Sequence, residues 1–174
     1  MRVIGFAGWS GSGKTTLVEQ VVRELTASGL AVSLIKHAHH SFDIDHRGKD
    51  SWRHRQAGCR EVLTSSRRRW SLVHELRGEA ELSLDQLLAH LSPSDLVLVK
   101  GFKRAAIAKI EVHREAVSER LLFPDDPHIV AVATDSPILD TGGLPRLDIN
   151  APERVAEFVL GYCFGARPVA SHAG

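Results

Sequence analysis

Residues 3–16 read VIGFAGWSGSGKTT and decide the fold of this chain. Residues 3–7 form an apolar run of strand length, and residues 14–28 carry apolar side chains at helical spacing. Between them, residues 8–15 match the pattern of a glycine, four residues, a glycine, a lysine and a serine or threonine that is typical of a phosphate-binding loop. The stretch therefore predicts a strand, a phosphate loop and a helix in succession.

The chemistry of phosphate binding explains why this loop needs these residue types. Glycines let the backbone turn so that consecutive N–H groups point at one phosphate, and the following helix adds its positive end. Lys14 is expected to bridge the β- and γ-phosphates, and Thr15 to offer a hydroxyl oxygen to Mg²⁺. A glycine-rich turn with a chance lysine is the alternative, but the flanking strand and helix favour nucleotide binding. The predicted nucleotide-binding residues of the loop are Gly11, Ser12, Gly13, Lys14, Thr15 and Thr16.

Apolar runs that alternate with helical patterns extend this beginning into an α/β fold. Further strands are expected at residues 30–35, 60–64, 70–76, 96–99, 107–112, 129–133 and 147–149. Helices are expected from about residue 50 to Gly58, after Ser83, and from Pro152 on, the last with its inward side chains at Val155, Phe158, Val159 and Tyr162. We predict a three-layer sandwich of the P-loop NTPase type with a mainly parallel, mixed sheet. It is expected to form one domain over residues 1–164, followed by a flexible tail over residues 165–174.

Composition and charge exclude several classes of protein. The chain has 174 residues, of which 43% are hydrophobic and 25% charged, which suits one folded domain rather than a disordered chain. The formal net charge of +1 lacks the excess expected for a nucleic-acid binder, and no run approaches the roughly 18 apolar residues of a membrane span. Cys59 and Cys163 form no disulfide or zinc pattern. We expect a soluble cytoplasmic protein that binds neither nucleic acid nor membrane.

The segment after the second strand is rich in histidine. The spacing of its histidines matches no standard transition-metal site, and a solvated polar loop is the simpler alternative. We favour a third interpretation, in which the segment opens at the carboxyl edge of the sheet beside the phosphate loop and contacts ligand or metal. The residues concerned are His37, His39, His40, His46 and His54, with Asp43, Asp45 and Asp50 interleaved.

Four parts of the chain together resemble one known family. They are the loop at residues 8–16, the segment KHAHH (36–40) with FDID (42–45) and GKDS (48–51), the strand DLVLV (95–99) followed by GFK (101–103), and KIE (109–111). This combination resembles the molybdopterin-guanine dinucleotide biosynthesis adaptor proteins, the B proteins of that pathway. The histidine-rich string is more specific than the phosphate loop, and the resemblance runs from Val3 to about Phe158.

The resemblance implies a function and a set of ligands. It implies a GTP-binding, Mg²⁺-dependent protein with weak or absent hydrolysis, which forms a homodimer through an extended sheet. It also implies an adaptor role for the guanylyltransferase that joins molybdopterin to GMP, with molybdopterin as a further candidate ligand. By the same resemblance, Lys49 lies near the nucleotide together with the loop residues. The implied metal ligands are Thr15, Asp45 and Asp50.

The chain departs from the family pattern at the end of the central strand. The family carries a glutamate before Gly-Phe-Lys, whereas Lys100 stands here. A carboxylate at that position would hold a metal-bound water or orient the attacking water, and a lysine does neither at neutral pH. Lys100 either neutralises phosphate charge or is an exposed strand-end residue without a role. Hydrolysis is therefore expected to be weaker than in the family.

Asp135 is the candidate residue for recognition of the base. It follows the expected strand at residues 129–133, and a carboxylate there can accept two hydrogen bonds from the N1–H and N2–H₂ groups of guanine. Adenine lacks this pair of donors, so such a site would reject it. The alternative is that Asp135-Ser136-Pro137 simply begins a turn.

A second class of function remains open beside the adaptor. The run Arg67-Arg68-Arg69-Trp70 could bind a phosphorylated pterin or a partner protein, although such runs are more often solvated loops. In a small-molecule kinase, this run together with Lys36 and Lys49 would clamp an acceptor and the γ-phosphate. Near-zero net charge argues against RNA as the ligand.

Overall fold

The computed structural model describes residues 1–38, 42–117 and 120–165, and the described chain divides into two compact units. We call them the sheet unit (Met1–His37 with Leu87 onward) and the insert unit (Ala38–Gln86). Sequence reasoning expected a single domain over residues 1–164, and the structure divides that stretch between these units. The expected tail lies largely outside the described residues. No helix in the described part combines the length and the apolar character needed to cross a membrane.

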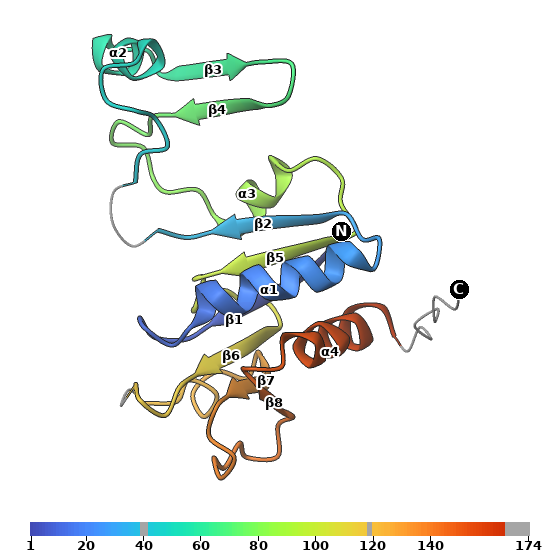
Figure 1. Ribbon diagram of the computed structural model, residues 1–174. Coiled ribbons are helices and arrows are strands. Elements are labelled where there is room, and N and C mark those ends of the chain that lie inside the picture. The colour runs from blue at the N-terminus through green and yellow to red at the C-terminus, as the bar shows by residue number, and fades with distance from the viewer. Residues whose placement is uncertain (39–41, 118–119, 166–174) are drawn as a thin grey trace. The chain divides into compact units, whose positions relative to one another are not determined.

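A six-stranded parallel sheet forms the sheet unit (Figure 1). Its strand order is β2-β5-β1-β6-β7-β8, and every pairing in it is parallel. The strands are β1 Arg2–Ala7, β2 Val32–Lys36, β5 Leu96–Lys100, β6 Lys109–His113, β7 Ile129–Thr134 and β8 Arg146–Asp148. The predicted α/β class is thereby confirmed. The sheet was expected to be mainly parallel and mixed, whereas the antiparallel pairing among the described residues lies in the insert unit.

The central strands are the most buried part of the chain. Leu96 to Val99 of β5 are each at most 1% exposed, as predicted for a strand covered on both faces. Helices α1 (Lys14–Ala27) and α4 (Pro152–Phe164) pack against each other and on the sheet. Their inward side chains join those of the sheet in one core. The core residues contributed by these helices are Leu17, Val18, Val21, Leu25, Val155, Ala156 and Val159.

Two details of the last helix correct the sequence-based expectation. Tyr162 was predicted to point inward but is 51% exposed, and it stacks on Phe158 with ring centroids 6.0 Å apart. Ala156 is buried in its place. A tyrosine ring carries a polar hydroxyl that stays hydrated at the surface, whereas the alanine side chain has no polar atom to bury. The helical spacing of apolar residues predicts the helix, but it does not decide which residues at the border of the apolar face are buried.

The loop between β6 and β7 is fixed to the sheet by buried charged groups. Glu111 is 1% exposed, and its carboxylate oxygens accept the backbone N–H groups of Leu122 and Phe123 at 2.8 and 2.9 Å. Burial raises the pKa of this carboxyl group. Buried Lys109 pairs with Asp126 at 2.8 Å. The KIE stretch therefore has a structural role: it holds a loop whose course the sequence left unassigned.

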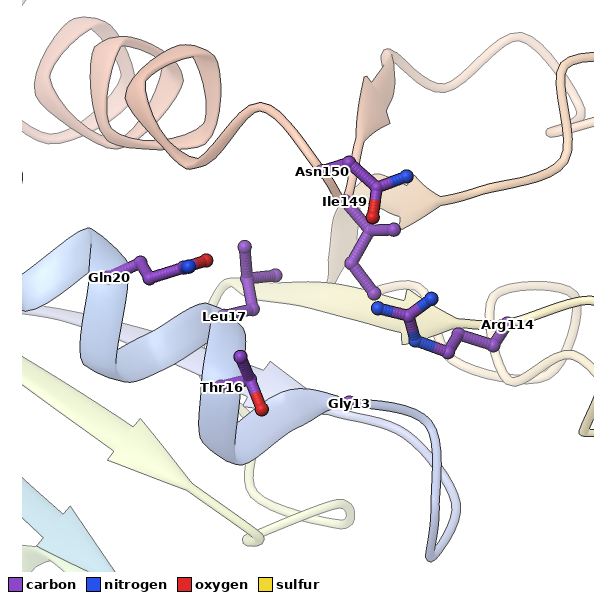
Figure 2. Close-up of a pocket in the computed structure, with 7 residues that line it drawn as sticks. All are labelled: Gly13, Thr16, Leu17, Gln20, Arg114, Ile149 and Asn150. Atoms are coloured by element: carbon purple, nitrogen blue, oxygen red, sulfur yellow. The ribbon is translucent and has the colours of Figure 1, made fainter.

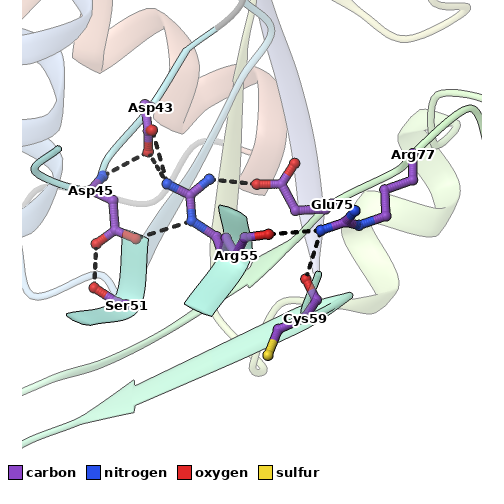
Figure 3. A network of polar contacts seen from close by, with 7 residues as sticks. All are labelled: Asp43, Asp45, Ser51, Arg55, Cys59, Glu75 and Arg77. Atoms are coloured by element: carbon purple, nitrogen blue, oxygen red, sulfur yellow. Dashed lines mark hydrogen bonds and ion pairs between the residues drawn. The ribbon is translucent and has the colours of Figure 1, made fainter. Parts of the chain in front are cut away.

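The described residues of the insert unit form a helix and a hairpin, and a further helix begins at the end of the unit. Helix α2 (Asp50–Ala57) ends at Gly58, which adopts a left-handed backbone with φ 118°, and strands β3 (Glu61–Ser65) and β4 (Trp70–His74) pair antiparallel. The buried guanidinium of Arg55 binds the carboxylates of Asp43, Asp45 and Glu75 (Figure 3). Since the unit has few buried apolar side chains, this ionic cluster occupies the place of a core.

Helix α3 (Leu84–Ala89), which was expected after Ser83, begins with a capping box. Gln86 Oε1 accepts the backbone N–H of Ser83 at 2.8 Å, and Ser83 Oγ accepts the backbone N–H of Gln86 at 3.2 Å. The helix itself is short and has no buried residue, so its leucines contribute less to the core than a crossover helix usually does.

Candidate functional site

The phosphate loop lies between β1 and α1, as the sequence predicted. Gly8 and Gly13 have positive φ angles of 148° and 84°, in which side chains are rarely accommodated. A Cβ atom on Gly8 would also come within 2.3 Å of the carbonyl oxygen of Val112, so the strand beside the loop leaves no room for one. Gly13 caps the N-terminus of α1. The glycines thus create the tight turn that places the helix terminus at the loop.

Lys14 is held by the loop itself. Its Nζ donates to the carbonyl oxygen of Trp9 and to Ser12 Oγ, the latter at 3.2 Å, and Ser12 is buried. Burial and the neighbouring ammonium groups of Lys103 and Lys100 lower the pKa of Lys14 to about 8. The charged form of Lys14 is therefore poorly stabilised in the protein without a ligand, and a phosphate anion would relieve this.

Two more lysines lie close to Lys14 of the loop, and a third, Lys36, ends the neighbouring strand β2. Lys100 ends β5, where it pairs in register with Phe6 of β1 and Lys36 of β2. Its Nζ donates to Thr15 Oγ1 at 2.7 Å, and burial together with Lys36 lowers its pKa. Lys103 Nζ lies 3.8 Å from the centre of the Trp9 ring. The carboxyl edge of the sheet is therefore strongly cationic at this point.

A pocket of about 160 Å³ opens beside the first turns of α1 (Figure 2). Thr16 and Gln20 come from successive turns of the helix, and Arg114 points toward them from the end of β6. Asn150 adds a second amide group after β8. The pocket is lined by Gly13, Thr16, Leu17, Gln20, Arg114, Ile149 and Asn150.

Asp135 supports this pocket by holding Arg114. Its Oδ2 accepts a hydrogen bond from Arg114 Nη1 at 3.2 Å, and its Oδ1 accepts the backbone N–H of Glu115 at 2.9 Å. The bond from Glu115 and the charge of Arg114 lower the pKa of Asp135. A Cβ atom on Gly13 would lie 2.8 Å from Arg114 Nε, so the guanidinium can come this close to the loop only because residue 13 is a glycine. Direct recognition of guanine by Asp135 stays a prediction.

The other predicted ligand residues belong to the insert unit. Asp45 uses both carboxylate oxygens within that unit, accepting from Arg55 Nε at 3.0 Å and from Ser51 Oγ at 2.6 Å. Lys49 and Asp50 are exposed at the start of α2. Their predicted roles at the nucleotide, and those of Asp45 and Asp50 as metal ligands, stay predictions.

The prediction that the histidine-rich segment contacts ligand or metal can be compared only with the described part of that segment. His39 and His40 lie outside the described residues. Within the described residues, no group of three or more His, Cys, Asp or Glu side chains is arranged to hold a metal ion.

Sequence reasoning missed three side chains of the pocket. Gln20 follows Thr16 by four positions, so helical spacing places it on the same face, and this signal was available. Arg114 and Asn150 follow the ends of parallel strands β6 and β8, where ligand-binding residues of α/β proteins usually lie. Which strand ends lie nearest the loop depends on the strand order, and no local pattern encodes that order.

The parallel sheet, the phosphate loop and the helix after it define an α/β protein of the nucleotide-binding P-loop class. The family model described as "Molybdopterin guanine dinucleotide synthesis protein B" matches residues 3–135, and the chain belongs to this family. A "Molybdopterin-guanine dinucleotide biosynthesis adapter protein" from Escherichia coli K12 is 42% identical over 165 residues, covering 91% of each chain. The protein of the same description from Haemophilus influenzae is 41% identical over 171 residues, covering 95% of this chain and 93% of the relative.

Solved structures agree with this assignment. A crystal structure of molybdopterin-guanine biosynthesis protein B superposes with a TM-score of 0.72 at 26% identity, covering 92% of this chain and 99% of the other. The crystal structure of MobB from Bacillus subtilis superposes with a TM-score of 0.75, covering 95% and 100% of the two chains. At 22% identity, the second likeness concerns the fold alone.

Proposed function

We propose that this protein is a GTP-binding adaptor that assists the enzyme joining molybdopterin to GMP, in the formation of the guanine dinucleotide form of the molybdenum cofactor. The observation that carries the proposal is Lys14, a partly desolvated lysine in a phosphate loop whose neighbours are further lysines. A site of this charge requires a polyanion, and a nucleoside triphosphate supplies one. The descriptions of the two bacterial relatives support the adaptor role.

The phosphates would bind at the loop and at the start of α1. Backbone N–H groups of the loop and of the first turn of α1 would donate to the phosphates, and the helix terminus adds positive potential. On binding, Lys14 exchanges the carbonyl oxygen of Trp9 for phosphate oxygens, which compensates its charge. The loop would bind triphosphate and diphosphate by the same backbone contacts, and a γ-phosphate would add further contacts with the lysines.

The nucleoside would occupy the pocket beside α1. Thr16 lies next to the phosphate loop, and Gln20 and Asn150 offer amide groups that can bind ribose or base. Each carboxylate oxygen of Asp135 accepts one described hydrogen bond and has capacity for another, so guanine N1–H and N2–H₂ can bind there. The planar guanidinium of Arg114, oriented by Asp135, can stack on the purine.

Hydrolysis is proposed to be weak or absent. At the end of β5 the chain carries an ammonium group where a carboxylate would orient the attacking water. GTP would therefore remain intact long enough to serve the partner enzyme. The homodimer and the molybdopterin ligand remain implications of the family resemblance, and so does Mg²⁺ on Thr15, where Lys100 offers an alternative cation.

Reconstitution with the partner enzyme tests this function. Formation of the guanine dinucleotide from molybdopterin and GTP is measured with and without the protein, and the parent protein is expected to increase the yield. Lys14→Ala should abolish the increase, whereas Arg23→Ala should not, because Arg23 is an exposed cation at the far end of α1, paired with Glu19. An unchanged yield with Lys14→Ala would refute the role of the loop. Turnover of GTP on addition of a small acceptor, without the partner enzyme, would favour the kinase.

A further inference from the structure

The contact between Lys100 and Thr15 occupies the position where a phosphate loop normally holds its metal. Thr15 Oγ1 follows the loop lysine, and it accepts a hydrogen bond from Lys100 Nζ at 2.7 Å. The backbone of Lys100 is held by its strand β5, which pairs with β1 on one side and with β2 on the other. The strand therefore places Lys100 near the loop, and its ammonium group reaches Thr15 in an exposed contact.

The surroundings of Thr15 do not fit Mg²⁺. Mg²⁺ binds oxygen at about 2.1 Å, so an ion on Thr15 Oγ1 would lie at most about 4.8 Å from Lys100 Nζ, the sum of the two bond lengths. Lys14 and Lys103 add further positive charge. Two carboxylates of this part of the sheet are already engaged: Glu111 within β6 accepts N–H groups at 2.8 and 2.9 Å, and Asp135 after β7 binds Arg114.

We propose that the Lys100 ammonium group takes the place of Mg²⁺ in this protein, so that it binds the β- and γ-phosphates of GTP without a divalent cation. This inference rests on the proposed function, because it concerns the same bound nucleotide. An ammonium group donates up to three hydrogen bonds, one of which Thr15 accepts, leaving two for phosphate oxygens. Lys14, Lys36, Lys100 and Lys103 together supply four positive charges against the three to four negative charges of a triphosphate.

A lysine in place of the metal has a functional consequence. An ammonium group neutralises the phosphates but holds no coordinated water. It also cannot change its set of ligands as the geometry of the γ-phosphate changes during hydrolysis. Binding and hydrolysis are thereby separated: GTP is retained, and its cleavage is not assisted. Such a site suits delivery of intact GTP.

The test compares GTP affinity in excess EDTA with affinity in excess Mg²⁺, measured by calorimetry. The parent protein is expected to show less than about a twofold difference. Lys100→Met should lose about tenfold or more in EDTA, which corresponds to one charge-assisted contact, and should regain affinity with Mg²⁺. Lys103→Met is the matched control: it removes a nearby positive charge that lies on the Trp9 ring and should weaken binding equally in both buffers.

A second readout reports the metal directly. Electron paramagnetic resonance of Mn²⁺ with GTP should detect no protein-bound ion in the parent and a bound ion in Lys100→Glu, where a carboxylate becomes available as a ligand. A parent protein that loses more than about tenfold in EDTA would overturn the inference and leave GTP binding intact. A parent that binds GTP in neither buffer would overturn both the inference and the proposed function.

Discussion

The carboxyl edge of the sheet near the phosphate loop carries four lysines, and none of them forms an ion pair with a carboxylate among the described residues. In the insert unit, by contrast, three carboxylates surround a single guanidinium. The bonds from Asp43 and Glu75 raise the pKa of Arg55, while the neighbours of Lys14 lower its pKa to about 8. Charge that is compensated within the chain stabilises the chain. Charge that is not compensated costs stability and becomes favourable only when an anionic ligand binds.

The largest effect is expected from breaking the compensated cluster. Arg55→Met leaves three carboxylates without their common cation, so the insert unit should lose its fold. Hydrogen exchange should report this as lost amide protection in α2, β3 and β4. Arg53→Met on the same helix is the control, since Arg53 is exposed. Unchanged protection in Arg55→Met would mean that packing rather than charge holds the unit together.

Removing the uncompensated lysine should have the opposite effect on stability. Lys14→Met is expected to lower the affinity for GTP about a hundredfold or more, because the β- and γ-phosphates lose their closest cation. The same variant should unfold at a temperature roughly 2–4 °C higher than the parent without nucleotide, because a poorly solvated charge is gone. Calorimetric titration and thermal unfolding measure the two effects. A less stable Lys14→Met would show that the charged lysine stabilises the protein without nucleotide.

Asp135 separates recognition of the base from support of the pocket. If its carboxylate binds guanine, Asp135→Ala should weaken GTP about tenfold or more and ATP little, because only guanine offers the paired donors. An equal loss for both nucleotides would show that Asp135 acts only by holding Arg114. Competition titrations with the two nucleotides distinguish these outcomes.

The smallest effect concerns pH. The pKa of Lys14 is about 8 in the folded protein and near 10.5 in the unfolded chain, so the unfolded chain binds more protons between these values. Stability from this group is present above pH 10.5 and is lost as pH falls through about 8. The difference in unfolding temperature between Lys14→Met and the parent should therefore shrink as pH rises from 7 to 10. A constant difference would contradict the lowered pKa.

The sheet and the loop could be predicted from the sequence because each depends on the residue types within a short stretch of chain. The glycines of residues 8–13 and the apolar run 96–99 need no knowledge of distant partners. Division into two units, the exposure of Tyr162 and the contact of Lys100 with Thr15 depend on strand order and on packing across many positions. The pattern marked Lys100 as unusual, but the side chain that it meets became clear only from the register of β5 with β1.

Calorimetric titration of GTP, GDP and ATP into the parent protein shows whether the phosphate loop binds guanine nucleotide. We expect one site per chain, with GTP bound more tightly than GDP because of the lysines at the γ-phosphate, and more tightly than ATP because of Asp135. Absence of binding heat for all three nucleotides at several temperatures, or equal affinity for GTP and ATP that Lys14→Met leaves unchanged, would contradict it.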